Sequence, residues 1–483
     1  MGDITTISNY IGGQALPPVH GKYLDNIAPA TGKVYALIPD SDDEDIAKAV
    51  MAAKRAFQQW SGMGAEKRSA IMLKVADLID EQLEDLAKAE SIDSGKPISL
   101  ARRMDIPRAS SNFRFFATAI LHTSTESHPT EGIALNYTLR QPLGVVGCIS
   151  PWNLPLYLFT WKIAPALAAG NCVIAKPSEI TPMTAYLLGQ LCEKAGMPPG
   201  VLNIVHGVGP KAGQAIIEHP ETKAISFTGG TQTGKHIART AAPMFKKLSL
   251  ELGGKNPNII FADCDFEEAV DTAVRAAFTN QGQICLCGSR ILVEASIYER
   301  FKDAFVDKVK DLVMGDPLEE STTMGAVVSQ AHQDKILGYI DAAKQLDGRI
   351  LTGGEKVHLS GRCEGGYFIQ PTVIEGLDAD CKINMEEVFG PVATLIPFAD
   401  EGEAIAMANC TEYGLAAMVW TNDLKRAHRV SEALHSGIVW VNCWLLRDLR
   451  TPFGGVKNSG VGREGGWEAL RFFTEAKNVC IKY

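Results

Sequence analysis

Five short apolar segments alternate with helices between residues 144 and 250, and this alternation constrains the fold more than any other feature. Segments that are apolar throughout are typical of strands buried on both faces. A strand–helix–strand order predicts a parallel, doubly wound sheet, which binds ligands at the carboxyl ends of its strands. The predicted strands are Gly144–Ile149, Cys172–Ala175, Val201–Val205, Ala224–Phe227 and Lys247–Leu250.

A chain of 483 residues is long enough for more than one domain. A second α/β unit is predicted to follow the Gly253–Gly254 junction and to extend over residues 254–468, while residues 1–123 and 143–253 form the first domain. In the first domain, Ser41 is predicted as an N-cap, and helices are expected over residues 65–86 and 98–121.

Two segments alternate between apolar and polar residues, namely 132–140 and 477–483. Such patterns are typical of exposed strands that pair with another chain. We therefore interpret segments 124–142 and 469–483 as oligomerisation strands of a homodimer or homotetramer. The alternative is two ordinary edge strands.

Composition excludes several classes of function. The net charge of −9 argues against nucleic acid as a partner. No apolar run is long enough to span a membrane, and Met1–Thr6 lack the regions of a signal peptide. The eleven cysteines occur singly, which favours a reducing, cytoplasmic location. No cysteine or histidine spacing indicates a metal site.

A cysteine-containing loop is predicted between a helix ending at Phe278 and a strand beginning at Ile291. Cys285 lies in this loop among glycine and amide side chains, a polar setting that suits a nucleophilic thiolate. The alternative is a small buried apolar side chain, as most free cysteines are. Cys287 is interpreted as a neighbour of the nucleophile.

Two glycine-rich turns lead from strand to helix, Gly207–Gly213 and Phe227–Gly234. Their backbone amides can approach a pyrophosphate at a helix N-terminus, although each can also be an ordinary loop. Lys176 and Glu179 follow another strand, where they can reach ribose hydroxyls. A glutamate there repels a 2′-phosphate and favours NAD over NADP.

Two further polar residues follow strands of the same sheet. Asn153 can donate its side-chain amide to a developing oxyanion, and Glu251 can act as a general base. Each residue taken alone is more often structural than catalytic.

These motifs together resemble the NAD(P)-dependent aldehyde dehydrogenase superfamily, in the family's order and over essentially the whole chain. The resemblance implies an aldehyde dehydrogenase-like fold with an NAD-binding domain, a catalytic domain and a small β oligomerisation element. The segments that carry it are Pro151–Asn153, Lys176–Glu179, Phe227–Gly229, Glu251–Asn256, Phe278–Cys285, Glu386–Pro391 and Pro452–Gly460.

The resemblance also implies roles. Cys285 would attack the aldehyde carbon, Asn153 and the Cys285 amide would hold the oxyanion of the thiohemiacetal, and Glu251 would activate water to hydrolyse the thioester. NAD would accept the hydride. Gly230 stands where many members carry serine, so any pyrophosphate contact there is through the backbone. The predicted cofactor-binding residues are Trp152, Lys176, Glu179, Gly209, Gly213, Phe227, Gly229, Gly230, Leu252, Glu387 and Phe389.

Two arginines occupy positions that line the substrate tunnel in relatives, Arg108 and Arg447. Arginine offers a planar fork that matches a carboxylate, so both predict a small-molecule aldehyde that carries a carboxylate. The alternative is that they pair with Asp105 or Asp448. The full predicted substrate-binding set is Arg108, Leu154, Tyr157, Trp161, Arg447 and Phe453.

The sequence around these arginines resembles the branch of 2-aminomuconic and 2-hydroxymuconic semialdehyde dehydrogenases, which act in tryptophan (kynurenine) and aromatic-ring degradation. Of the two substrates, the resemblance favours 2-aminomuconate 6-semialdehyde, oxidised to 2-aminomuconate. Alternatives are a betaine-aldehyde or retinal type of dehydrogenase, a CoA-acylating relative, and a catalytically inactive NAD-binding or structural homologue.

Overall fold

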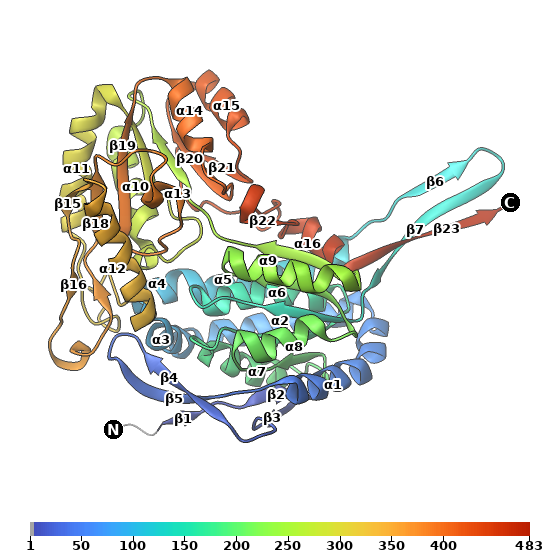
Figure 1. Cartoon of the computed structure of the whole chain (residues 1–483). Coiled ribbons are helices and arrows are strands. Elements are labelled where there is room, and N and C mark those ends of the chain that lie inside the picture. Colours follow the sequence, from blue (N-terminus) through green and yellow to red (C-terminus); the bar gives the residue numbers. More distant parts are fainter. Residues whose placement is uncertain (1–3) are drawn as a thin grey trace.

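Two large β-sheets and a projecting arm make up the part of the chain that the computed structural model describes, residues 4–483 (Figure 1). Met1–Asp3 lie outside the described residues, so part of the segment predicted not to be a signal peptide has no structural account.

The first sheet has eight strands, and its five central strands are parallel, as predicted. The flanking strands β22, β2 and β3 pair antiparallel to their neighbours. Because β8 and β9 are buried along their whole length, they read as continuous apolar segments. In spatial order the strands are β22 (Gly460–Val461), β12 (Lys247–Glu251), β11 (Thr222–Thr228), β8 (Val145–Ile149), β9 (Cys172–Lys176), β10 (Leu202–Ile204), β2 (Asn9–Ile11) and β3 (Gln14–Leu16).

Helices surround this sheet, and every residue of α6 is buried. Helix α5 packs against both α2 and α6. The helices are α1 (Asp43–Gly62), α2 (Ala65–Glu81), α3 (Leu83–Ser94), α4 (Ile98–Leu100), α5 (Ile106–Ala119), α6 (Pro155–Ala168), α7 (Met183–Lys194), α8 (Gln214–Glu218) and α9 (Thr231–Ala241).

Three details of the predicted helices are wrong. The N-cap of α1 is Asp42, which forms a capping box with Asp45, whereas Ser41 is buried and accepts a hydrogen bond from Asn9. The predicted helix over residues 65–86 is two helices that meet at Gln82. The one predicted over residues 98–121 contains a π-helical turn, Ala101–Asp105.

The second sheet has seven strands, of which only the outer strand β15 pairs antiparallel among the described residues. Its strands are β15 (Arg349–Thr352), β18 (Thr372–Glu375), β19 (Val392–Phe398), β14 (Arg290–Glu294), β13 (Pro257–Ile260), β20 (Ala416–Trp420) and β21 (Ile438–Val441). Its main helices are α10 (Phe266–Phe278), α11 (Tyr298–Lys310), α12 (Gln330–Gln345), α14 (Glu401–Asn409) and α15 (Leu424–Ala433).

The chain passes between the sheets at the Gly253–Gly254 junction, because β12 ends at Glu251 and β13 begins at Pro257. It returns to the first sheet at β22. Smaller elements are β1 (Thr5–Thr6), β4 (Tyr23–Ala28), β5 (Lys33–Pro39), β16 (Lys356–Val357), β17 (Phe368–Ile369), α13 (Lys382–Met385) and α16 (Gly466–Phe472).

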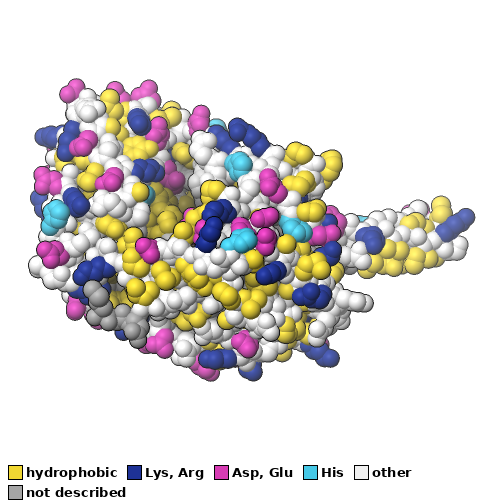
Figure 2. Space-filling model, turned by 60° about the horizontal axis from the view of Figure 1, so that its bottom comes forward, with side chains coloured by type: hydrophobic (Ala, Val, Ile, Leu, Met, Phe, Trp, Pro, Cys, Tyr) yellow, Lys and Arg dark blue, Asp and Glu magenta, His cyan; other side chains and the backbone are white. Residues whose placement is uncertain are grey.

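The two alternating segments pair with each other and form the arm. Strand β7 (Ala134–Pro142) lies between β6 (Ser127–Thr130) and the C-terminal strand β23 (Thr474–Lys482), all antiparallel. Figure 2 shows the arm projecting from the body with apolar side chains along it. Ile133, Leu139 and Ile481 are among its exposed side chains. Within residues 4–483, no helix is long and apolar enough to cross a membrane.

Candidate active site

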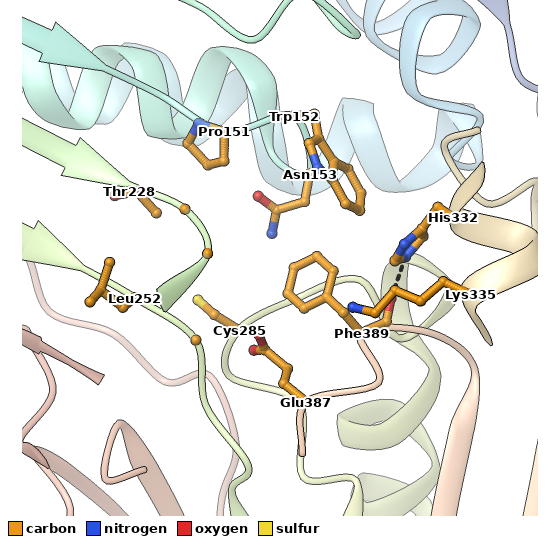
Figure 3. Close-up of a pocket in the computed structure, with 13 residues that line it drawn as sticks. Pro151, Trp152, Asn153, Thr228, Leu252, Cys285, His332, Lys335, Glu387 and Phe389 are labelled. Carbon is orange, nitrogen blue, oxygen red and sulfur yellow. Dashed lines mark hydrogen bonds between the residues drawn. The ribbon is translucent and has the colours of Figure 1, made fainter. Parts of the chain in front are cut away.

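Four neighbouring cavities share lining residues at the candidate site, and Cys285 lines two of them. A groove of about 800 Å³ follows the carboxyl ends of the first sheet's strands. It shares Trp152 and Gly229 with an inner cavity of about 240 Å³, whose wall includes Cys285 (Figure 3). On the other side, a narrow passage also touches Cys285 and shares Arg447 with an outer cavity of about 590 Å³. Cys285 therefore lies between the inner cavity and the passage and lines both.

The loop before Cys285 is held by buried amide side chains. Gln281 donates to the Ala326 carbonyl at 2.7 Å, and Gln283 accepts from the Val328 amide at 3.0 Å. Asn280 and Gln281 both adopt left-handed backbone angles. Gly282 also has a positive φ, and a Cβ there would collide with the Gly390 carbonyl. The amides that appeared to provide a polar setting for the thiol therefore fix the shape of the loop.

Cys285 is half-buried. Burial raises the pKa of its thiol well above the ordinary value, and the carboxyls of Glu387 and Glu251 raise it further, while Arg447 acts in the opposite direction. The thiol is therefore protonated near neutral pH, and attack on a carbonyl carbon requires a proton acceptor. Cys287 is buried, and burial likewise raises the pKa of its thiol to about 12.

Asn153 lies in the loop between β8 and α6, and its amide points into the inner cavity with Cys285 nearby (Figure 3). Its Nδ2 donates to the Gln283 carbonyl at 2.9 Å. An amide nitrogen carries two hydrogens, so the second remains available to an oxyanion. Asn280 in turn donates to the Asn153 carbonyl at 2.9 Å.

Glu251 ends β12 and lines the narrow passage together with Cys285. Its side chain is buried, and neither carboxyl oxygen has a hydrogen-bond partner within residues 4–483. Burial raises the pKa of Glu251 well above its usual value, and Glu464 raises it further. Lys162, which pairs with Glu464 at 2.8 Å, lowers it. Glu251 can accept a proton only in its ionised form, and its burial disfavours that form.

The far wall of the inner cavity is aromatic. The Trp152 and Phe389 rings are edge to face, with centroids 5.3 Å apart. His332 is hydrogen-bonded to the Phe389 carbonyl at 2.7 Å, and burial lowers the pKa of His332 to about 4. Glu387 accepts from the Gly254 amide at 2.8 Å, while burial raises its pKa to about 7.

The groove suits an extended dinucleotide. Lys176 and Glu179 lie on its wall, 3.0 Å apart, and the Glu179 carboxylate is one-third exposed. Helix α9 starts after Gly230 without a side-chain cap, and nothing lies within 4 Å of where a Gly230 Cβ would be. Backbone amides at this helix N-terminus are therefore open to a phosphate. Gly209, Gly213 and Phe227 line the same groove, whereas Leu252, Glu387 and Phe389 line the inner cavity.

Arg447 joins the passage to the outer cavity. It donates to the Tyr157 hydroxyl at 2.7 Å, and its guanidinium lies 4.0 Å from the Phe453 ring centroid. Arg108 lines the outer cavity, 5.5 Å from the Tyr157 centroid. Within residues 4–483, neither arginine forms an ion pair with a carboxylate, because Asp105 is bound to Lys96 and Asp448 to Arg450.

Of the remaining predicted substrate-binding residues, three line the passage and one does not. Leu154, Tyr157 and Phe453 line it directly. Trp161 is buried behind Arg447, with the guanidinium 5.2 Å from its ring centroid.

The amino-acid sequence matches the aldehyde dehydrogenase family over residues 18–479. The chain belongs to this family. As an aldehyde dehydrogenase it is similar to proteins of two named activities and to a solved structure. The 2-aminomuconic semialdehyde dehydrogenase of Bos taurus is 50% identical, with 100% of this chain and 99% of that protein covered. The 2-hydroxymuconic semialdehyde dehydrogenase of Pseudomonas sp. (strain CF600) is 44% identical, with 99% of each covered.

The structural comparison agrees with the sequence. The NAD+ complex structure of an aldehyde dehydrogenase from Bacillus cereus has a TM-score of 0.96 and 41% identity, covering 99% of this chain and 96% of that one. The predicted aldehyde dehydrogenase-like fold and family are therefore confirmed.

Sequence reasoning missed several residues of this aldehyde dehydrogenase's site. His332 and Lys335 on α12 line the inner cavity, as does Thr228 (Figure 3). Glu464 lines the passage. The turn that contains Thr228 was a usable signal. None of the other three belongs to a motif, so no local pattern indicated them.

Proposed function

We propose that this enzyme oxidises 2-aminomuconate 6-semialdehyde to 2-aminomuconate with NAD. The observation that carries the substrate class is Arg447, which has no carboxylate partner within residues 4–483 and lies where the passage to Cys285 opens. An aldehyde in the passage would place a carboxylate at its far end beside Arg447 and Arg108. Several relatives about 50% identical are 2-aminomuconic semialdehyde dehydrogenases, which supports the 2-amino compound.

The chemistry proceeds through a covalent intermediate on Cys285. The thiol proton passes to water, the sulfur attacks the aldehyde carbon, and the oxyanion of the thiohemiacetal accepts a hydrogen bond from Asn153. The groove would hold NAD, which when bound would supply the acceptor for the hydride that this carbon loses. Cys285 then carries a thioester.

Hydrolysis completes the turnover. Ionised Glu251 takes a proton from water, the resulting hydroxide attacks the thioester, and the carboxylic acid leaves as the Cys285 sulfur is released. The absence of hydrogen-bond partners around Glu251 within the described chain leaves its carboxyl oxygens free to take a proton from water. A base in this position favours water over CoA as acceptor.

The cofactor residues follow from the groove and inner cavity. Lys176 and Glu179 would hold the adenosine ribose, and Glu387 the nicotinamide ribose, with Phe389 against the nicotinamide end. Residues 1–123 and 143–253 then form the NAD-binding domain, and residues 254–468 the catalytic domain.

The arm would join subunits in a homodimer or a homotetramer. Its exposed apolar side chains support this proposal, since they are covered by no part of the described chain. All eleven cysteines lie in the described chain and are free, which supports a cytoplasmic location.

The test measures NADH formation from purified enzyme with NAD and three aldehydes. They are 2-hydroxymuconic semialdehyde, betaine aldehyde and a plain aliphatic aldehyde. The first is a workable stand-in for its less stable 2-amino analogue. We expect strong preference for the carboxylated semialdehyde. Preference for either other aldehyde would contradict the carboxylate site while leaving the oxidoreductase chemistry intact. Comparing the 2-amino and 2-hydroxy compounds directly then decides between the two named activities.

A further inference from the structure

A fully buried lysine lies directly behind Asn153. Lys96 is in the short loop between α3 and α4, and its side chain has no solvent exposure. Its Nζ donates to the Asn153 backbone carbonyl at 3.1 Å and to the Asp105 carboxylate, while the Glu90 carboxylate lies 3.7 Å away. An ammonium has three N–H donors, and these three oxygens surround it.

Such a cluster is a poor way to gain stability. Lys96, Glu90 and Asp105 are all completely buried, and replacing buried ionic groups by apolar side chains is often neutral or stabilising. Burial raises the pKa of Glu90 to about 8 and also raises that of Asp105. Hydrogen bonds are directional, whereas apolar packing is not. A buried ion cluster can therefore fix where a partner atom lies.

The partner atom here belongs to the loop that carries the predicted oxyanion donor. The Asn153 carbonyl accepts from Lys96 on one side and from Asn280 of the cysteine loop at 2.9 Å. Its side-chain Nδ2 donates to the Gln283 carbonyl. Of these three hydrogen bonds, only the one from Lys96 connects Asn153 to a part of the chain outside the cysteine loop.

We propose that Lys96 is a positioning residue for the oxidation. Held by Asp105 and Glu90, it fixes the Asn153 backbone so that the free N–H of the Asn153 amide meets the oxyanion of the thiohemiacetal. The inference rests on the function proposed above for Asn153. Lys96, Glu90 and Asp105 line none of the four cavities, so the cluster would act on acylation only through Asn153.

The test uses an uncharged aliphatic aldehyde, so that the arginines are not involved, with saturating NAD. The readout is the pre-steady-state rate of NADH formation in the full-length enzyme. We expect Asn153→Ala to lower this rate by about 10²- to 10³-fold. Lys96→Met should lower it by about tenfold to a hundredfold, the scale of a small displacement of a reacting group. In the Asn153→Ala background, Lys96→Met should change the rate by less than about twofold.

A matched control separates positioning from stability. Tyr35 donates to Asp93, a buried carboxylate one turn from Glu90 on α3, away from the cavities. Tyr35→Phe should lower the melting temperature without changing the rate. Should Lys96→Met fail to fold, Asp105→Asn keeps the side-chain volume, and it should show a smaller loss that also vanishes in the Asn153→Ala background.

The rates of these variants decide whether the Lys96 cluster positions Asn153 or is only structural. An unchanged rate in the Lys96 or Asp105 variant, or losses that multiply with Asn153→Ala, would make the cluster merely structural and overturn the inference alone. An unchanged rate in Asn153→Ala itself would overturn the function proposed for Asn153, and with it the role of Lys96.

Discussion

Arg447→Ala gives the sharpest test of the substrate class. The Arg447 guanidinium has five N–H groups, of which one is used by the Tyr157 hydroxyl. The planar guanidinium can present two of the remaining N–H groups to one carboxylate. Each hydrogen bond to a charged group contributes about 1.5 kcal/mol or more, so the variant should lose about 3 kcal/mol. At 1.4 kcal/mol per factor of ten, kcat/KM for the carboxylated semialdehyde should fall about a hundredfold.

The assay compares steady-state NADH formation from the carboxylated semialdehyde and from a plain aliphatic aldehyde. The loss should appear mainly as a higher KM for the first and change the second by less than about threefold, since the second makes no ion pair. Arg471→Ala is the matched control, because Arg471 is exposed, lines none of the four cavities and is already paired with Glu468 at 2.8 Å. Such surface pairs contribute little, so both aldehydes should be unaffected. Equal losses for the two aldehydes in Arg447→Ala would refute the carboxylate site.

The remaining predictions concern the covalent steps. Cys285→Ala should lower NADH formation by about 10³-fold or more, whereas Cys287→Ala should retain most of it; comparable losses would contradict the choice of nucleophile. Glu251→Gln should form about one NADH per site and then stall as a thioester, visible by intact-protein mass spectrometry; continued turnover would exclude Glu251 as the base. Because burial and Glu464 raise the pKa of Glu251, the rate of thioester hydrolysis should increase with pH as Glu251 ionises. Glu464→Gln should move that increase to lower pH, and a shift to higher pH would contradict this account.

Much of the fold follows from local pattern. Strands β8 and β9 were predictable because a strand buried on both faces is apolar along most of its length. Their parallel order followed from the helices between them. Glycine and amide residues marked the turn at Gly229 and the loop at Cys285, where backbone geometry is dictated nearby in the sequence. The break between α2 and α3 at Gln82 has no such signal, because it contains neither glycine nor proline.

The sequence by itself determined the parallel arrangement of the central strands and the candidate nucleophile, and only the tertiary structure decided which charges are left unpaired. Asp105 and Asp448 were both possible partners for Arg108 and Arg447. In the folded chain, Asp105 pairs with Lys96 and Asp448 pairs with Arg450. The partners are only nine and two residues apart along the chain, so their pairing depends on the direction in which the folded backbone points each side chain. A periodic pattern reports which face of an element is buried, but it does not report which charged group lies opposite.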